Sequence, residues 1–421
     1  MAKVFFSRFG SHRQMNREAR GLQLLSERGV PAPVLLGRHS VAGGGGVLLI
    51  EYLDPAERVM ERWQAVCHEK AGSAAQMEVL EPLFALVGVM HAVGLCQKDL
   101  HLDNFLWHQG QLKTVDGGGI VPCRGVRKQA ANLGLLISQL PWQSTDLISK
   151  LLVAYQGRSG SVPFTSSQLV KAAEKQRHQR LKDYLAKTLR DSTEFLVRKN
   201  FFRFSSTVRF SSSWLAELVQ DPDKAMESGT PLKLGGGTTV VQLELDGHAV
   251  VVKRYNRGNL GRFLKRCWRI SRARKSWLAG HRLRTLGIDS PQPLALIEER
   301  WGILCSRSWL VTEYIDGVNI FDLMSNYRKD TPPVGVMDAF VTLFKSLYRA
   351  RISHGDMKAT NLVWEDSRIW LIDLDGMKAH RYEVTFGRAW KKDKKRFLRN
   401  WGNGFERQNW ANILFSYLES I

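Results

Sequence analysis

The sequence predicts an α+β protein made of two tandem copies of one bilobal domain, each with a small mixed β lobe followed by a mainly helical lobe. Three observations predict it. The chain has 421 residues, enough for two or three domains. One polar motif occurs twice, and strand-like and helix-like segments follow one another in the same order around both occurrences. Hydrophobic residues make up 44% and charged residues 24% of the chain, which is typical of globular proteins and excludes a disordered or collagen-like one.

The repeat is clearest in QKDLHLDNFLW, residues 97–107, and HGDMKATNLVW, residues 354–364. Each contains an aspartate, an asparagine five positions later and then an apolar pair, and a further aspartate follows 12 residues after the asparagine. Equivalent residues are 257 positions apart, namely Asp99 and Asp356, Asn104 and Asn361, and Asp116 and Asp373. Upstream, LLIEYLD resembles LVTEYIDG, and LSERGVPAPVLL resembles LRTLGIDSPQPLAL. Two copies of one domain therefore fill almost the whole chain.

The boundary between the copies is predicted in QDPDKAMESGTP, because proline, aspartate, serine and glycine favour turns and exposed linkers. This places a first domain at residues 1–219, a linker at 220–231 and a second domain at 232–421. Before the linker, Leu181, Leu185 and Leu189 repeat at helical spacing, which predicts a helix that closes the first domain.

In the second copy the order of elements is a glycine turn, a strand over residues 249–253, a basic helix, a strand ending at Glu313, a helix and the motif loop. The segment LVTEYI is rich in β-branched and aromatic residues, which favour a strand. Met337, Phe340, Phe344 and Leu347 repeat every three to four residues, which indicates a helix. The first copy shows the same order from its own strand-like start.

The three repeated polar residues suit magnesium-dependent phosphoryl transfer. The first carboxylate, Asp356 or Asp99, would orient a substrate hydroxyl and accept its proton. The amide and the second carboxylate offer Mg²⁺ hard oxygen ligands, from Asn361 and Asp373 in one copy and from Asn104 and Asp116 in the other. D-x-x-x-x-N alone is a weak pattern, but its recurrence with a third aspartate in register is specific.

Other parts of a phosphate site follow in order in the second copy. Gly235, Gly236 and Gly237 precede a β-branched strand and would let backbone amides approach phosphates, although three glycines alone indicate only a turn. Lys253 ends the strand HAVVVK, where a lysine pairs with nucleotide phosphates. Glu313 and Ile315 fall where the hinge between the two lobes would offer backbone groups to adenine. The end of a strand explains these two residues equally well. Lys358 would neutralise charge on the transferring phosphate.

These residues resemble the protein-kinase-like superfamily, and HGDMKATNLVW with LIDLDG is similar to its bacterial branch, the lipopolysaccharide core heptose and Kdo kinases. RISRARKSW and KDLHLDNFLW are similar to that family too. The resemblance covers nearly all of the chain except the linker and the joining helix. It implies ATP- and Mg²⁺-dependent phosphorylation of a heptose or Kdo hydroxyl of the inner core, at the cytoplasmic face of the inner membrane of a Gram-negative bacterium.

The sequence departs from the kinase pattern in each copy. Kinases pair the strand lysine with a glutamate on the next helix, and Lys3 with Glu18 fits this in the first copy. The second copy has Lys275 at the corresponding point, so another group must hold Lys253 or that domain is impaired. Only two residues precede Lys3, so the first copy lacks the glycine-loop strands and has a truncated small lobe. The second copy is therefore the expected catalyst, and the first either acts on a second hydroxyl or binds substrate as a pseudokinase.

Basic residues exceed acidic ones by 21, which predicts anionic partners. RGNLGRFLKRCWRISRARKSW and RAWKKDKKRFLRNW interleave basic and aromatic residues, which suits an anionic inner-membrane surface and the phosphates of lipid A glycolipid, although solvated helices with buried tryptophans have the same pattern. No nucleic-acid-binding motif is present, so nucleic acid is not an expected partner. No apolar run is long enough to span a membrane, so peripheral attachment is expected.

Five scattered cysteines without a C-x-x-C pair predict neither a disulfide framework nor a zinc site, and fit a reducing cytosol. Two other functions stay open on sequence alone. One is a non-catalytic scaffold that binds core glycolipid or a partner enzyme, and the other is a kinase for a soluble metabolite or an aminoglycoside.

Overall fold

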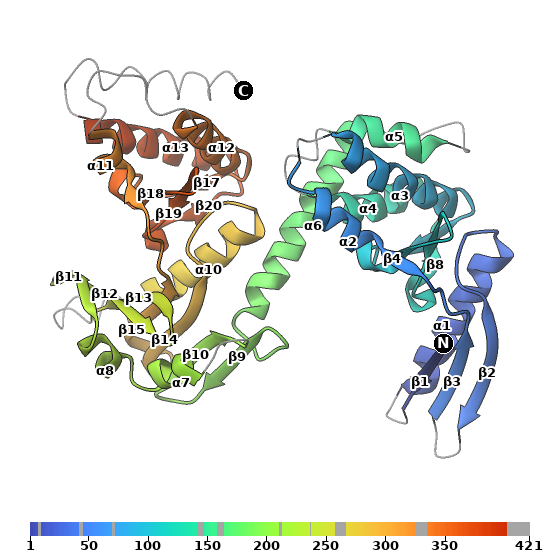
Figure 1. Ribbon diagram of the computed structural model, residues 1–421, viewed down its shortest axis with the longest axis horizontal. Coiled ribbons are helices and arrows are strands. Elements are labelled where there is room, and N and C mark those ends of the chain that lie inside the picture. The colour runs from blue at the N-terminus through green and yellow to red at the C-terminus, as the bar shows by residue number, and fades with distance from the viewer. Residues whose placement is uncertain are drawn as a thin grey trace. The chain divides into compact units, whose positions relative to one another are not determined.

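The computed structural model describes residues 1–6, 10–41, 45–69, 72–140, 147–157, 164–209, 213–235, 237–256, 267–325 and 335–401. The chain separates into two compact units, Met1–Arg180 and Leu181–Ile421. Each unit has its own β-sheets and its own hydrophobic cores (Figure 1). The mixture of helices and antiparallel sheets confirms the predicted α+β class.

The first unit begins with a three-stranded antiparallel sheet of order β1-β3-β2. Its strands are β1 (Ala2–Phe5), β2 (Leu35–Val41) and β3 (Gly45–Ile50). Helix α1 (Ser11–Glu27) packs on this sheet because its apolar residues recur at helical spacing, whereas those of β3 alternate. The small core they share contains Met15, Ala19, Leu22, Leu48 and Ile50.

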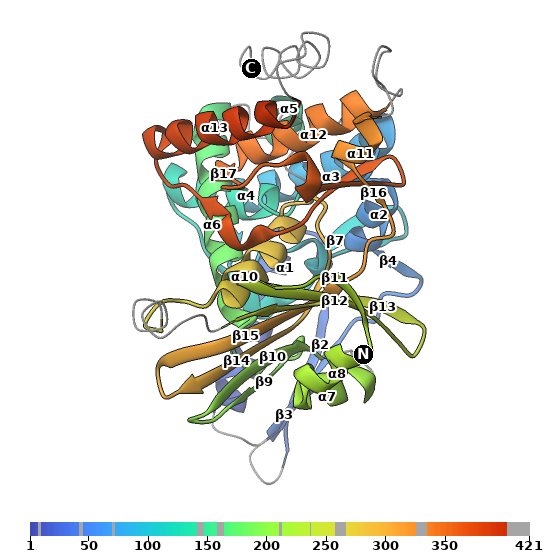
Figure 2. The same cartoon turned by 90° about the vertical axis from the view of Figure 1, so that its left-hand side faces the viewer.

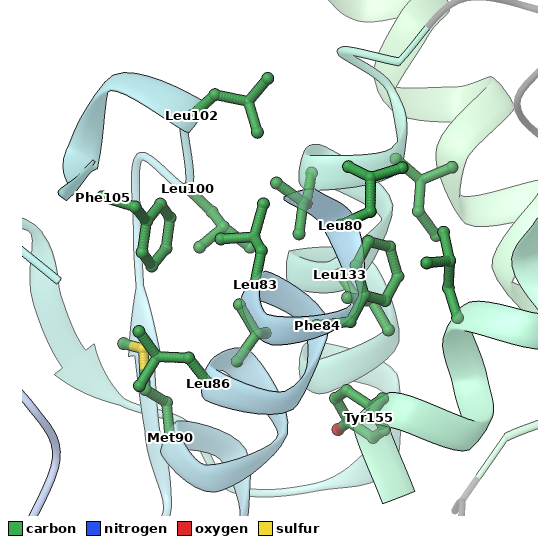
Figure 3. Packing of buried hydrophobic residues seen from close by; sticks show 14 of the residues in the cluster. Leu80, Leu83, Phe84, Leu86, Met90, Leu100, Leu102, Phe105, Leu133 and Tyr155 are labelled. Atoms are coloured by element: carbon green, nitrogen blue, oxygen red, sulfur yellow. The ribbon is translucent and has the colours of Figure 1, made fainter. Parts of the chain in front are cut away.

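The rest of the first unit is mainly helical. Its helices are α2 (Val59–Val66), α3 (Ala74–Ala92), α4 (Val126–Ile137), α5 (Ile148–Gln156) and the first part of α6 (Ser166–Lys187). Helix α3 is apolar on most of its surface, so it is buried at the centre of the unit. Its Leu80, Leu83 and Phe84 pack with Leu133 of α4 and Tyr155 of α5 (Figure 3).

Two small sheets carry the polar motif of the first unit. The first has the order β4-β6-β7 and the second pairs β5 with β8. The strands are β4 (Ala56–Arg58), β5 (Leu95–Gln97), β6 (Phe105–His108), β7 (Gln111–Thr114) and β8 (Ile120–Pro122). Asp99 and Asn104 therefore lie between β5 and β6, and Asp116 follows β7 directly.

The second unit contains a seven-stranded antiparallel sheet of order β11-β12-β13-β15-β14-β10-β9. The strands are β9 (Phe195–Lys199), β10 (Arg203–Val208), β11 (Thr230–Lys233), β12 (Thr238–Leu245), β13 (His248–Tyr255), β14 (Pro293–Trp301) and β15 (Leu304–Glu313). Successive side chains point to opposite faces. One face packs on α10 (Arg272–Thr285), and the other on α7 (Ser213–Gln220) and α8 (Pro222–Glu227) (Figure 2).

The helical part of the second unit contains α11 (Ile320–Ser325), α12 (Val336–Arg349) and α13 (Glu383–Leu398). The predicted apolar stripe lies on α12, where Phe340, Phe344 and Leu347 are buried. This part also contains a sheet of order β16-β18-β19 and a β17-β20 pair. These strands are β16 (Val318–Asn319), β17 (Ile352–Ser353), β18 (Leu362–Glu365), β19 (Arg368–Leu371) and β20 (Lys378–Ala379). The second motif thus lies between β17 and β18, as the first lies between β5 and β6.

The division between the units differs from the predicted boundary. Residues 220–231, predicted as a linker, contain α8 and the start of β11. Asp223 fixes α8 to the sheet, since its carboxylate accepts hydrogen bonds from Arg254 (3.0 Å), Arg307 (2.7 Å) and the Trp309 indole (3.0 Å). Proline and aspartate here begin a helix, with Asp221 as its N-cap, rather than an exposed linker.

Helix α6 continues across the division at Arg180. It was predicted to close the first domain, but its last turns belong to the second unit. There Tyr184 contacts Phe195 and His281 edge-on, with ring centroids 6.1 and 5.9 Å apart. The sequence pattern identified the helix but not the core that receives its apolar face.

Two of the cysteines form a disulfide, Cys96–Cys123, with their Cα atoms 5.1 Å apart. The expectation that the cysteines form no disulfide is therefore wrong for this pair. Cys96 lies opposite Val121 in the β5–β8 ladder, so the fold brings together two residues separated by 27 positions, a spacing that carries no local signal. Among the described residues, no helix has both the length and the apolar composition needed to cross a bilayer.

A buried ion cluster joins α10 to the sheet of the second unit. The Glu298 side chain is 1% exposed, and its carboxylate accepts hydrogen bonds from Ser271 (2.5 Å), Arg274 (2.7 Å) and Arg300. A buried carboxylate is tolerated only when it is paired and hydrogen-bonded, so the cluster holds the start of α10 in place.

We expect Glu298→Ala to lower the free energy of unfolding of the second unit by about 3–5 kcal/mol, because it leaves Arg274 and Arg300 without their buried counter-charge. The matched change Glu299→Ala removes a half-exposed pair with Arg307 and is expected to cost about 1 kcal/mol or less. Urea unfolding followed by tryptophan fluorescence measures both. Equal effects of the two changes would contradict this account of the cluster.

Candidate active site

The motif loop of the second unit is fixed by hydrogen bonds to its backbone. The Asn361 Nδ2 atom donates to the Asp356 carbonyl oxygen (2.9 Å), which closes the loop and leaves Oδ1 as a ligand atom. The buried carboxylate of Asp393, on α13, accepts from the backbone N–H groups of His354 (2.6 Å) and Gly355 (2.9 Å). Gly355 has a φ of +83°, and a Cβ there would lie 2.5 Å from the Gly376 carbonyl oxygen, so the loop requires glycine at this position.

The Asp356 carboxylate lies between two cations. Lys358 Nζ is 2.7 Å from Oδ2 and Arg396 Nε is 3.0 Å from Oδ1. Burial would raise the pKa of Asp356, but the hydrogen bonds and charges of Lys358 and Arg396 outweigh it and lower this pKa below its usual range. Asp356 is therefore an ionised carboxylate that is held by its neighbours and can accept a hydrogen bond.

Asp373 begins the turn after β19 with a φ of +58°, and its carboxylate faces Lys253 of β13. Lys253 Nζ lies 2.5 Å from Asp373 Oδ1. Burial acts to raise the pKa of Asp373, but the charge and hydrogen bond of Lys253 outweigh it and lower this pKa. Asp373 is thus the group that holds Lys253 in the absence of a helix glutamate.

A second pair lies beside the first. Arg272, in the first turn of α10, binds Asp375 at 2.5 Å and lies over the Tyr255 ring, 4.8 Å from its centroid. A Cβ on Gly237 would lie 3.8 Å from Arg272 Nη1, so Arg272 also lies next to the glycine turn. Arg272 therefore connects α10 with the segment that follows Asp373. In the first unit the Glu18 carboxylate of α1 makes the corresponding connection, to the turn that follows Asp116.

A cavity of about 540 Å³ in the second unit is lined by the Lys253 and Asp373 pair and by Asn361, whereas Asp356 and Lys358 are not among its lining residues. The predicted residues Lys253, Glu313, Ile315, Asn361 and Asp373 all line it. Its walls also include apolar side chains from the sheet and from the strands near the motif, among them Val240, Val251, Leu310, Val363 and Leu371. A cavity lined by apolar side chains together with charged and amide groups suits a ligand that has both a ring and an anionic part.

The glycine turn joins β11 to β12 beside this cavity, which Leu232, Lys233 and Thr238 help to line. Gly235 has a φ of +91°, a conformation that favours glycine. The Gly237 carbonyl accepts from the Asn256 N–H (3.1 Å), which ties the turn to the end of β13. Gly236 lies outside the described residues.

The first unit repeats most of this geometry. Asn104 Nδ2 donates to the Asp99 carbonyl (2.7 Å), and Lys3 Nζ lies 3.0 Å from Glu18 and 3.9 Å from Asp116. A Cβ on Gly21 of α1 would lie 1.8 Å from the Gly117 carbonyl oxygen, so glycine lets the helix pack directly on the turn after Asp116. The predicted pair of Lys3 with Glu18 is present.

The electrostatics of the two aspartates differ. Burial, reinforced by the neighbouring carboxylate of Glu18, raises the pKa of Asp116, and the Lys3 charge only partly offsets this. The pKa of Asp373, which has a lysine and no glutamate beside it, is lowered. Of the two aspartates, Asp373 therefore stays ionised more readily and is the better ligand for a cation.

Sequence reasoning missed Asp393 and Arg396 because they lie in RAWKKDKKRFLRNW, which was interpreted as a basic membrane surface. Two aromatic residues of this segment, Trp390 and Phe397, are buried in the core. Trp277 of the other basic segment is buried too, and Arg272 and Arg274 form ion pairs. Residues 257–266 and 402–421 lie outside the described residues. A single acidic residue among lysines was the available signal for Asp393.

Asp393 positions the motif loop, and we expect Asp393→Asn to lower kcat by about 10- to 100-fold if this loop is catalytic, with little change in the affinity of the cavity for its ligand. The amide retains one acceptor oxygen, but its NH₂ group would face a backbone N–H of the loop. Steady-state kinetics and ligand titration separate the two effects. A fall in kcat that only matches a loss of folded protein would contradict the positioning role.

Comparisons with known proteins identify the family of the chain. A model of the lipopolysaccharide kinase (Kdo/WaaP) family matches residues 2–118 and 220–417. A 3-deoxy-D-manno-octulosonic acid kinase of Vibrio cholerae is 25% identical over 218 residues, covering 48% of this chain and 86% of that protein. A solved structure of WaaP in complex with acyl carrier protein matches with a TM-score of 0.37 and 20% identity, covering 49% of this chain and 87% of the other. With the family matched over most of its length, the chain belongs to the lipopolysaccharide kinase (Kdo/WaaP) family and is a phosphotransferase.

Proposed function

We propose that the protein transfers the γ-phosphoryl group of Mg·ATP to a heptose or Kdo hydroxyl of the lipopolysaccharide inner core, and that the second unit is the catalyst. The observation that carries this proposal is the convergence of Lys253, Asn361 and Asp373 at one cavity, with the Asn361 amide bonded to the backbone carbonyl of Asp356. The family and the name of the Vibrio relative support the acceptor class.

The residues fit a magnesium nucleotide. Bound there, Mg·ATP would supply the phosphoryl group and neutralise its charge. Asn361 Oδ1 and the ionised Asp373 would hold the metal, because hard oxygen atoms are the ligands that Mg²⁺ prefers. Glu313 and Ile315 would offer backbone groups to adenine. Gly235 and Gly237 would let backbone amides approach the phosphates. Lys253 would leave Asp373 and bind a phosphate oxygen instead.

Asp356 would orient the acceptor hydroxyl and take its proton. Its lowered pKa makes it a weak base, which suits phosphoryl transfer because the proton leaves late and positioning supplies most of the rate. Lys358 would move from Asp356 to the transferring phosphoryl group, while Arg396 keeps the carboxylate oriented.

We propose that the first unit is a second kinase-like copy with a small three-stranded lobe. Its sheet contains three strands, among which β1 carries Lys3, and its Asp116 has a raised pKa beside Glu18. These features favour a supporting role in substrate binding, with Asp99, Asn104 and Asp116 kept in a kinase-like arrangement. We also propose that the protein works at the cytoplasmic face of the inner membrane, attached peripherally, because its acceptor is a glycolipid.

The test is ADP production from Mg·ATP with either of two acceptors, dephosphorylated core lipopolysaccharide in detergent or a water-soluble aminoglycoside, and in a control without acceptor. The proposal expects ADP production only with the glycolipid. Production with the aminoglycoside alone would favour a small-molecule kinase. No acceptor-dependent production with any of them would favour the scaffold.

A further inference from the structure

Two hairpin turns lie side by side at one end of the large sheet of the second unit (Figure 2). Asn200, Phe201 and Phe202 connect β9 to β10, and Trp301–Ile303 lie where β14 meets β15. The Phe202 carbonyl accepts from the Arg300 N–H (2.7 Å), and the Phe201 carbonyl from the Gly302 N–H (2.9 Å). The two turns therefore form one structural edge.

Large apolar side chains are exposed along this edge. Phe201 and Phe202 are each 61% exposed, Trp301 70% and Ile303 77%. A third segment adjoins them, because the Cys267 carbonyl accepts from the Cys305 N–H (2.9 Å), and this segment carries Trp268 and Ile270, 69% and 59% exposed. We call these six residues, Phe201, Phe202, Trp268, Ile270, Trp301 and Ile303, the aromatic edge. Exposed apolar residues gathered in this way mark an interaction surface.

The backbone holds these side chains outward. Asn200 Oδ1 accepts from the N–H groups of Phe202 (2.9 Å) and Arg203 (2.7 Å), which fixes the first turn. The rings of Phe201 and Phe202 meet edge to face at 5.1 Å, and Phe201 lies against Gly302, where a Cβ would be 3.2 Å from its ring. The surface is thus formed before any partner binds, so little conformational entropy is lost on contact.

The charges around the aromatic edge are positive. Arg198, Lys199 and Arg269 are exposed beside it. The nearby carboxylates are already paired, Glu298 with Arg274 and Arg300, and Glu299 with Arg307 at 2.7 Å. Aromatic side chains flanked by basic residues fit the headgroup region of a bilayer that contains anionic lipid.

We propose that the aromatic edge is the surface by which the protein inserts into an anionic phospholipid bilayer. The inference deepens the proposed function, since a kinase of a membrane-embedded glycolipid must reach the bilayer. The hairpin of Phe201 and Phe202 lies within residues 119–219, which the family model does not match. The occupant we infer is anionic lipid, because the exposed basic residues Arg198, Lys199 and Arg269 lie beside the aromatic edge.

The test is co-sedimentation of the full chain with sucrose-loaded vesicles of phosphatidylcholine, with and without phosphatidylglycerol, in the absence of ATP and acceptor. Phe201→Ser/Phe202→Ser is expected to weaken partitioning into the anionic vesicles by about tenfold or more, because each ring loses its apolar contact. Tyr382→Ser is the matched control, because this aromatic side chain is also 63% exposed in the same unit but lies outside the edge. It is expected to bind like the unmodified protein.

A second variant, Trp301→Ser/Ile303→Ser, alters the other turn and is expected to weaken partitioning in the same way. Equal binding by all variants, or no binding by the unmodified protein, would overturn the proposal. Light scattering gives a further outcome, because a dimer that the Phe201/Phe202 change converts to monomers would assign the edge to a second copy of this chain. Vesicle binding is measured without ATP or acceptor, so it tests the aromatic edge even if the kinase assay fails. The kinase assay likewise tests the proposed function even if the protein does not bind vesicles.

Discussion

Replacing Asp356 with asparagine is expected to lower kcat for glycolipid phosphorylation by about 10²–10⁴-fold, the loss typical of removing a group that handles a proton in the transition state. The amide can still bind Lys358 or Arg396, so the loop stays folded. It cannot take the hydroxyl proton, so KM for ATP is expected to change little. Initial rates of ADP production at saturating acceptor measure the effect.

The matched change is Asp99→Asn in the first unit. Asp99 occupies the same place in its loop, with Asn104 bonded to its carbonyl. If the second unit is the catalyst, Asp99→Asn leaves kcat close to that of the unmodified protein and acts, if at all, on the KM for the glycolipid. A large loss of kcat in Asp99→Asn with activity preserved in Asp356→Asn would reverse the assignment.

Asp373→Ala is expected to abolish the dependence of ATP affinity on magnesium. The unmodified protein should bind ATP at least about tenfold more tightly with Mg²⁺ than with a chelator, because in the proposed site Asp373 and Asn361 would share the metal with the nucleotide. The variant also frees Lys253 from its 2.5 Å contact, so binding of metal-free ATP should not fall. Calorimetric titration with and without Mg²⁺ gives both affinities.

Asp116→Ala is the control for this change, because Asp116 follows the equivalent strand in the first unit. It is expected to keep the full magnesium effect. If Asp373→Ala retained that effect and Asp116→Ala lost it, the nucleotide would belong to the first unit.

The sequence was sufficient to predict the elements closest to the motifs. A repeat with constant spacing identified both polar loops, and the β-branched run of HAVVVK placed Lys253 on a strand. The pair of Lys3 with Glu18 was predictable from the resemblance to kinases, which pair the strand lysine with a glutamate on the next helix. In these cases local pattern and tertiary contact agree.

Contacts that depend on distant packing were not predictable. Asp393 lies 37 residues after Asp356, and only the burial of Trp390 and Phe397 turns its side of α13 towards the loop. The boundary was misplaced because β9 and β10 join the second sheet through β14, a pairing for which the residues of 195–208 carry no local signal. Cys96 and Cys123 meet for the same reason, across the β5–β8 ladder.

The most direct test of the central claim is mass spectrometry of dephosphorylated core lipopolysaccharide after incubation with the full chain and Mg·ATP. The account predicts that the glycolipid gains a phosphoryl group on an inner-core heptose or Kdo, and that Asp356→Asn fails to add it. ATP hydrolysis without phosphorylated glycolipid, or phosphorylation that persists in Asp356→Asn, would contradict it.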